Sequence, residues 1–491
     1  MSATFRLVAA AILATALLLA QTASGELPPE GRCPDFTGAP GEPGDIDTGT
    51  PLVKEGALID LNDLLALRQL LPEEVWSYRE AFFYEGMQMT IGFCHRRYPV
   101  ADFYRDATET FRGRATLDDE GNLTNYEAGL PFPPDTIDPE SQDAAIRWAW
   151  DFEHRYRGSG PVGRFRLTDM PSRIGTPQTF EGTWHFLRTG HRSDLVASDY
   201  RVAESTKTEW VAGGRFLEPT NARHLAWRQA RPRSSATDYT EPDDIFVYVP
   251  DLRKPRRAAS TWTDGLYTPR YSVSGVEGAG GSVPFGTSGG SELSPGGLEA
   301  IAPTAGLLLA ATEDIRKGFT GMALRPNAYD WTLLGMQEVL APLNGVEEGW
   351  PGMSNRNYGH TGLSVASDRW DVRYAVVVRG RSRRVIDHVA AITLWIDYQT
   401  QQPLYFISQR KNGFLLDIGI LVHRFSGDRA GYPAWPGGER ARVFDPVAAS
   451  FYYVPGGGAG WRRESYDVQS VPVDPGKLRK LTSTDELIKG R

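Results

Sequence analysis

The clearest hydrophobic pattern in the chain lies between Asp387 and Phe425, where three successive antiparallel strands are predicted. In the first of them, Ile392, Leu394 and Ile396 alternate with other residues at the period of two that strands show. Both faces of this sheet carry many apolar or aromatic side chains. It must therefore be covered by protein on both sides, or by protein on one side and an apolar ligand on the other.

Two turns separate these strands. The first follows Trp395 and is rich in Asp, Gln, Thr and Pro, and the second strand runs over Leu404–Arg410. The dipeptide Asn412-Gly413 predicts a type I′ turn with two positive φ angles, and a third strand follows over residues 414–424. The pattern favours a curved sheet over a catalytic motif.

The period of two also marks strands elsewhere. Seven further strands are predicted before the segment at 387–425: Arg164–Asp169, Gly182–Thr189, Asp199–Val211, His224–Ala230, Asp244–Pro250, Asp330–Leu340 and Arg369–Gly380. The first five are bounded by turn residues and suggest a meander. With 52 Gly, 34 Pro, 13 Trp, 20 Tyr and 21 Phe, the composition is that of a mainly β chain with helices (α+β).

Helical spacing appears in four places. Asn62 and Asp63 are suited to cap a helix over Leu64–Leu71, and Pro72 with two acids opens another turn. Aromatic and small residues at helical spacing predict a helix over Ser141–Arg157, ended by Gly158. Residues 305–317 predict a short helix lying over the sheet.

The chain divides by composition. Residues 1–25 predict a secretory signal peptide, with Arg6 before an apolar run. We expect an extended Pro/Gly-rich arm over 26–60, an N-terminal helical region over 61–160, a curved sheet over 161–470 with a flexible Gly/Ser loop at 272–297, and a tail over 471–491. The mature chain is expected in the periplasm. Cys33 and Cys94 either pair in that oxidising compartment or remain isolated thiols.

A net charge of −8 and a pI near 5.6 argue against general nucleic-acid binding. The eight His are scattered without zinc-site spacing, so neither a metal nor a cofactor is expected.

Gly286–Gly290 matches the G-x-S-x-G pattern around Ser288. Because Pro284 precedes it and Gly, Ser and Pro follow, the strand and helix of a nucleophile elbow are missing. A secreted serine hydrolase is only a minor alternative.

Several segments resemble the envelope family called domain of unknown function 1329, which is similar in architecture to the periplasmic lipoprotein carrier and its outer-membrane receptor. The matching segments are Gly129–Pro133, the helix bearing Trp148 and Trp150, Arg155–Gly158, Asp243–Arg257, Asp330–Glu338, Trp370–Arg373 and Trp395–Pro403. The resemblance implies an incomplete, curved antiparallel β-barrel closed by helical lid elements, with an interior that takes acyl chains. It also implies an outer-membrane partner protein and a resistance-nodulation-division type transporter.

Candidate ligand-binding residues follow from the pattern and the resemblance together. Trp331, Trp370 and Trp395 either line the hollow interior or belong to ordinary core. The remaining apolar candidates must face either a helix or a ligand: Ile392, Leu394, Ile396, Phe406, Leu416, Ile418 and Ile420.

Arg253, Arg256 and Arg257 form a basic run after a predicted strand and are candidates for a ligand head group. Lys254-Pro255 interrupts the Arg run typical of the family. The alternative is a solvated strand end paired with acids.

The sequence pattern and the family resemblance together favour a non-catalytic periplasmic carrier or adaptor for a lipid, a lipoprotein acyl chain or another hydrophobic molecule. The main alternative is a structural adaptor with a packed interior that docks on outer-membrane and transporter partners.

Overall fold

A computed structural model of the chain describes residues 27–35, 52–170, 176–196, 200–202, 207–220, 222–250, 254–257, 266, 321–347, 356–384, 389–454 and 460–489. The predicted signal peptide, the Gly/Ser loop at 272–297, the short helix at 305–317, Ser288 and Arg253 lie outside the described residues.

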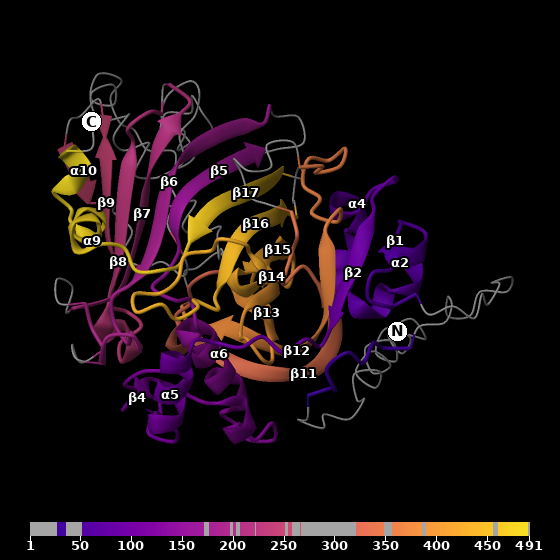
Figure 1. Cartoon of the computed structure of the whole chain (residues 1–491), viewed down its shortest axis with the longest axis horizontal. Helices are drawn as coiled ribbons and strands as arrows, with labels where there is room; N and C mark the ends of the chain where they lie inside the picture. The colour runs from indigo at the N-terminus through magenta and orange to yellow at the C-terminus, as the bar shows by residue number, and fades with distance from the viewer. Residues whose placement is uncertain are drawn as a thin grey trace, which may run out of the picture.

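One curved sheet of 15 strands organises the molecule (Figure 1). Its strands are β1 (Leu58–Ile59), β2 (Met89–Cys94), β5 (Val162–Met170), β6 (Gln178–Arg188), β7 (Thr208–Glu218), β8 (Ala226–Pro232), β9 (Asp244–Val249), β10 (Lys254–Arg257), β11 (Tyr329–Ala341), β12 (Arg369–Ser382), β13 (Ala391–Asp397), β14 (Pro403–Gln409), β15 (Leu415–Phe425), β16 (Phe444–Tyr453) and β17 (Gly460–Gln469). A separate small sheet pairs β3 (Thr116–Leu117) with β4 (Leu123–Thr124).

The α-helices are short and lie around the sheet. They are α2 (Asp63–Ala66), α3 (Glu73–Ser77), α4 (Arg79–Phe82), α5 (Asp102–Thr110), α6 (Ala144–His154), α9 (Pro475–Thr482) and α10 (Glu486–Lys489). Short 3-10 turns are η1 (Arg68–Leu70), η2 (Pro134–Thr136), η5 (Arg233–Ala236), η7 (Pro326–Ala328) and η8 (Ser426–Asp428). No helix within the described residues has both the length and the apolar character needed to cross a bilayer.

The sheet runs in the order β1-β2-β12-β13-β14-β15-β16-β17-β5-β6-β7-β8-β9-β10, with β11 beside β12. Neighbours pair antiparallel except β2 and β12, which pair parallel. The sheet does not close into a barrel, because β10 at its far end pairs with β9 alone. The predicted mainly β class, with a curved open sheet, is confirmed. So are the three strands at 387–425 and the meander, which is formed by β5 to β10.

The predicted strand over Asp199–Val211 was misplaced, because β7 begins at Thr208 and runs to Glu218. Gly213 and Gly214 look like turn residues but lie inside this strand. A Cβ built on Gly214 would come within 2.6 Å of the Trp227 ring, so the glycine leaves the space that the indole occupies.

The hairpin at Asn412-Gly413 is present, but its predicted turn type was wrong. Gly413 has a φ of +78°, but the φ of Asn412 is not positive. A type I′ turn needs a positive φ at both central residues. The Gly413 N–H donates to the Arg410 carbonyl at 2.9 Å, and the Arg410 N–H to the Phe414 carbonyl at 2.9 Å. The loop is therefore a three-residue connection that ends on a left-handed glycine.

The helices also differ from the prediction. The helix expected over Leu64–Leu71 is divided into α2, which ends at Ala66, and the 3-10 turn η1. The aromatic helix, α6, ends at His154, and Arg155 is already extended at φ −52° and ψ 156°. Asn62 makes no side-chain cap. The Asp60 carboxylate takes that role, accepting from the N–H groups of Asn62 at 2.7 Å and Asp63 at 3.0 Å.

The register shows which side chains share a face, because directly paired residues point to the same side of a sheet. We call the side on which α6 lies the inner face. Under α6 it carries Val378, Leu394, Phe406 and Phe451, which pack with Trp148 and Phe152 of the helix in one buried cluster. The opposite, outer face of the same strands packs against α2, α3, α4 and η1. This half of the sheet is covered by helices on both sides.

The other half, β17 and β5 to β9, has the C-terminal helices on its outer face (Figure 1). Arg228 Nε donates to the Thr482 carbonyl at 2.6 Å, and Arg215 Nη2 to the Leu487 carbonyl at 2.9 Å. Near the N-terminus, Cys33 and Cys94 form a disulfide with a Cα–Cα distance of 5.1 Å, which ties residues 27–35 to β2.

Candidate functional site

The structure divides the ten apolar candidates between the two faces of the sheet. Ile392, Leu394, Ile396 and Phe406 lie on the inner face beneath α6. Trp370, Trp395, Ile418 and Ile420 lie in the cluster with the N-terminal helices. Trp331 and Leu416 are partly buried.

The ten residues therefore do not form one wall. Leu394 and Trp395 are neighbours on a strand, so they must point to opposite sides. Within the described residues each of these sides is covered by helices, and the eight buried candidates are at most 5% exposed. A contact between any of them and a ligand remains a prediction.

The basic head-group candidates lie at the far edge of the sheet. Arg256 and Arg257 belong to β10, and Arg257 is exposed, with its Nε 3.3 Å from an Asp244 carboxylate oxygen. Lys, Pro and Arg on an edge strand discourage pairing with another chain. The Arg257 contact matches the alternative of a strand end paired with an acid, and a head-group role remains a prediction.

A second cluster, which the sequence reasoning did not single out, occupies the inner face beyond α6. It is rich in aromatic residues, and we call it the aromatic inner face: Phe165, Phe180, Trp184, Phe186, Trp210, Phe216, Trp227 and Tyr466. Register places all of them on one side, since Phe165 pairs with Tyr466 and Trp184 with Gly214, which pairs in turn with Trp227. All are buried.

The rings of this face contact one another. Ring centroids lie 5.2 Å apart for Phe216 and Trp227, 5.8 Å for Phe165 and Phe216, and 5.9 Å for Phe165 and Trp227. The Trp227 Nε1–H is buried and has no hydrogen-bond partner among the described residues. Of the described residues that are not on the sheet, this cluster includes Ala222, Leu225, Leu266, Met322 and Ala323. The described residues of this cluster include none from α6.

The signal for this face was present in the sequence. Phe180, Trp184 and Phe186 stand at even spacing along one strand, and Trp210 and Phe216 do so along the next. Sequence alone could not align the two strands, because register decides which aromatics meet.

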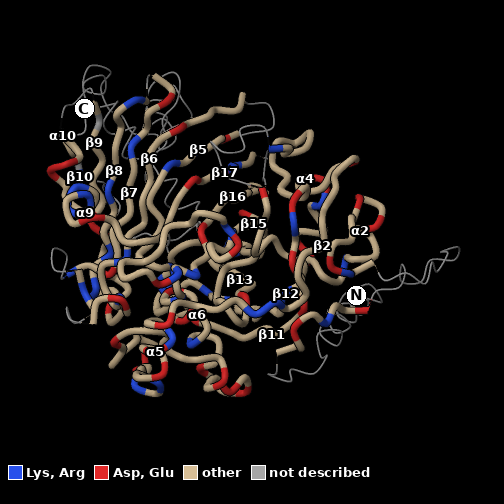
Figure 2. Tube along the Cα trace, in the orientation of Figure 1, with Lys and Arg blue, Asp and Glu red and all other residues tan. Residues whose placement is uncertain are grey.

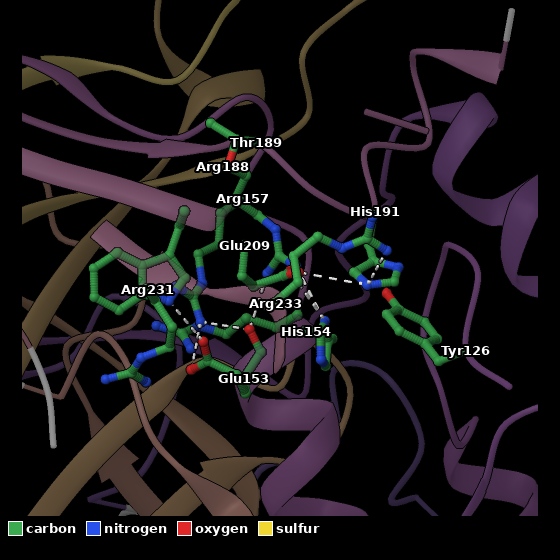
Figure 3. A network of polar contacts seen from close by, with 12 residues as sticks. Tyr126, Glu153, His154, Arg157, Arg188, Thr189, His191, Glu209, Arg231 and Arg233 are labelled. Carbon is green, nitrogen blue, oxygen red and sulfur yellow. Dashed lines mark hydrogen bonds and ion pairs between the residues drawn. The ribbon is translucent and has the colours of Figure 1, made fainter. Parts of the chain in front are cut away.

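At one end the aromatic inner face becomes polar. Trp210 is paired with Arg188 on β6 and with Arg231 on β8, and the C-terminal end of α6 meets the sheet there (Figure 3). Figure 2 shows basic residues gathered beside α6. We call the buried charged groups here the polar network: Glu153, His154, Arg155, Arg157, Arg188, Glu209, Arg231, Asp243 and Arg325.

Arg188 joins three elements. Its Nη2 donates to Glu209 Oε1 at 2.6 Å and lies 3.0 Å from His154 Nδ1, while its Nη1 donates to the Glu153 carbonyl at 3.0 Å. Burial acts to lower the pKa of Arg188, but nearby acids, Glu209 first, outweigh burial and the pKa is raised. Burial and the neighbouring Arg188 hold the pKa of His154 well below its ordinary value, so this imidazole is neutral.

Asp243 anchors the other side of the network. It accepts from Arg231 Nε at 3.1 Å and from Arg325 Nη2 at 2.5 Å. Arg231 Nη1 donates to the Leu324 carbonyl at 2.8 Å, and the Leu324 N–H donates to Glu153 Oε2 at 2.7 Å. The segment around Leu324 is thus fixed between α6 and β8.

Arg155 and Arg157 follow α6 directly. Arg155 donates to Gln402 Oε1 at 3.1 Å and to the Met322 carbonyl at 3.2 Å. Arg157 Nη2 donates to the Glu153 carbonyl at 2.7 Å, and its guanidinium carbon lies 5.0 Å from the ring centroid of Phe186. Burial lowers the pKa of Arg157 to about 10, so the group remains charged at neutral pH.

One surface cavity within the described residues lies elsewhere, on the outer face of β11 and β12. It has a volume of about 410 Å³ and is lined by Asp330, Thr332, Leu334, Arg379 and Arg381. Over the described part of the chain, no group of three or more His, Cys, Asp or Glu is placed to hold a metal ion.

A family model described as "Protein of unknown function (DUF1329)" matches residues 62–277. This confirms the resemblance stated from the sequence, over that segment. No curated protein matches the chain.

Solved structures similar to this chain include three bacterial proteins, each 12% identical to it. A putative outer membrane lipoprotein-sorting protein domain from Vibrio parahaemolyticus has a TM-score of 0.36 and covers 70% of this chain and 100% of its own. A DUF1329 family protein from Desulfovibrio piger has a TM-score of 0.39, with 71% and 99% covered. A LolA superfamily protein from Nitrosomonas europaea has a TM-score of 0.31, with 70% and 98% covered.

Proposed function

We propose that this chain, whose residues 62–277 belong to the DUF1329 family, is a non-catalytic periplasmic carrier or adaptor for a hydrophobic molecule such as a lipid or a lipoprotein acyl chain. The bound molecule lies on the aromatic inner face, and its apolar part contacts the rings of β5 to β8. An outer-membrane protein and a resistance-nodulation-division type transporter are its proposed partners.

The observation that carries this proposal is the asymmetry of the inner face. Under α6 the inner face is filled by the helix, whereas over β17 and β5 to β8 it carries a buried group of aromatic side chains whose cluster, within the described residues, includes no helix. Rigid aromatic walls with few polar groups are typical of sites for apolar ligands.

The physical case for a carrier rests on exposure to water. Each CH₂ group of an acyl chain gains ~0.8 kcal/mol on leaving water, so a chain that diffuses between membranes needs a covered surface. Release at the acceptor requires moderate affinity. A face with many weak apolar contacts meets both requirements, and such a carrier needs no catalytic group.

The alternative function is a structural adaptor with a packed interior. The burial of Leu394 and Phe406 under α6, and of Ile418 under the N-terminal helices, favours it for that half of the sheet. A full-length adaptor of this kind takes up no lipid and acts by docking on envelope partners.

Native mass spectrometry of the protein purified from periplasm, followed by organic extraction, separates the two functions. The carrier predicts an acyl-containing species close to one per chain. A ligand-free mass, together with no uptake of the uncharged fluorescent probe N-phenylnaphthylamine, would exclude the carrier and leave the adaptor.

A further inference from the structure

Arg157 has buried hydrogen-bonding groups that the fold leaves unused. The residue is 6% exposed, and its Nη2 donates to backbone carbonyls at the end of α6 and lies 3.6 Å from Glu153 Oε2. Its Nε and Nη1 are buried and have no hydrogen-bond partner among the described residues. Unpaired N–H groups of a buried cation are costly, more so than those of a neutral side chain.

The charges around Arg157 are also unbalanced. The polar network holds more guanidinium groups than carboxylates: Arg155, Arg157, Arg188, Arg231 and Arg325 against Glu153, Glu209 and Asp243. Asp151, another buried acid on α6, has its pKa raised well above the ordinary value by burial. A buried excess of positive charge is stabilised when an anion joins it.

Arg157 lies where the polar network meets the aromatic inner face. Its guanidinium stands over the ring of Phe186, and that ring contacts Trp210 with centroids 5.1 Å apart. Figure 3 shows Arg157 beside Arg188 and Glu209. The inner face is therefore amphipathic, with rings along most of its length and cationic donors at the end near α6.

We propose that the ligand is an anionic amphiphile whose single carboxylate or phosphate group accepts a hydrogen bond from the unpartnered Nη1 of Arg157 while its apolar chain lies along the aromatic inner face. This assignment rests on the proposed carrier function and adds the chemical class of the cargo. Nε and Nη1 lie on different edges of the guanidinium, so one oxygen of the anion accepts from Nη1 in a charge-assisted hydrogen bond.

The test compares amphiphiles that share a chain and differ in the head group. Hexadecanoate, hexadecyl phosphate and hexadecanol compete with N-phenylnaphthylamine on the full mature chain at pH 8. We expect each anion to bind about tenfold or more tightly than the alcohol, the scale of a charge-assisted hydrogen bond. A preference for hexadecyl phosphate alone would identify a phosphate head group, and one for hexadecanoate alone a carboxylate.

Two variants test whether the preference for anionic amphiphiles depends on Arg157. In Arg157→Gln the anions fall to the affinity of hexadecanol, while hexadecanol itself binds as in the parent. Arg166→Gln is the matched control, because Arg166 is paired with Glu181 on the outer face of β5 at 2.6 Å. Equal binding of alcohol and anions in the parent, or an unchanged preference in Arg157→Gln, would overturn the head-group assignment and leave the carrier intact. Failure of the parent to bind either the probe or any amphiphile would instead remove the carrier function.

A second measurement needs no variant. Hexadecanoate labelled with ¹³C at its carboxyl carbon is titrated by NMR in the complex. Contact with Arg157 predicts a carboxyl pKa below that of the free acid. A raised pKa, as burial without a cation would produce, contradicts the assignment.

Discussion

Arg188 at the end of β6 and Glu209 near the start of β7 form a buried ion pair, with Nη2 and Oε1 2.6 Å apart. The same guanidinium donates to the Glu153 carbonyl on α6. One side chain therefore fixes the position of α6 relative to the strands that carry the aromatic inner face.

Arg188→Met should destabilise the protein by about 3–5 kcal/mol, because Glu209 would remain buried without its partner. The free energy of unfolding from urea titrations measures this effect. The double variant with Glu209→Gln should recover much of the loss. An Arg188→Met protein as stable as its parent would show that the pair does not hold α6 to the sheet.

Stability should fall in mild acid because the buried imidazoles of His154, His185, His191 and His423 have lowered pKa values. Burial lowers the pKa of His185 and of His423 to about 3 in each case. The unfolded chain has an ordinary His pKa of about 6.5, so between these values the unfolded state binds more protons and stability rises with pH. This contribution is complete above about pH 6.5 and is lost as the pH falls toward 3, by up to about 1.4 kcal/mol per unit for each imidazole.

Urea midpoints between pH 7.5 and 4.5 test this dependence. His423→Gln should lower the slope of stability against pH, and His360→Gln, at an exposed site, serves as the control. The same slope in the parent and in His423→Gln would refute the assignment for His423.

Leu394 should behave as a core residue. Its side chain, on β13 of the sheet, is fully buried beneath α6. Leu394→Ala is therefore expected to lower the free energy of unfolding by about 2–5 kcal/mol through lost contacts and a cavity. The folded fraction should bind N-phenylnaphthylamine as the parent does. Loss of probe binding without loss of stability would instead place Leu394 in a ligand pocket, as one reading of the sequence had it.

The sequence predicted the strands well because their evidence is local. Alternation at period two identified β13 to β15 and most of the meander, and helical spacing identified α6. It misplaced β7, where Gly213 and Gly214 lie inside the strand and Gly214 leaves space for the Trp227 ring of the neighbouring strand. It also could not say whether a helix or a ligand covers each apolar face, since that depends on elements far away in the chain.

The polar network escaped prediction for a similar reason. Arg157, Arg188 and Arg231 are spread over the sequence and meet only when α6 docks on β6 and β8. Arg155–Gly158 was noted as part of the family resemblance, but no spacing rule marks an Arg as buried or a donor as unpaired.

Quenching of tryptophan fluorescence by a brominated hexadecanoate tests the central claim most directly, because bromine quenches only rings that it approaches. We expect the parent to be quenched, and Trp227→Phe to lose part of that quenched emission. Trp76→Phe, on α3 outside the inner face, should keep all of it. Quenching that is absent, or that is unchanged by Trp227→Phe, would contradict a ligand on the aromatic inner face.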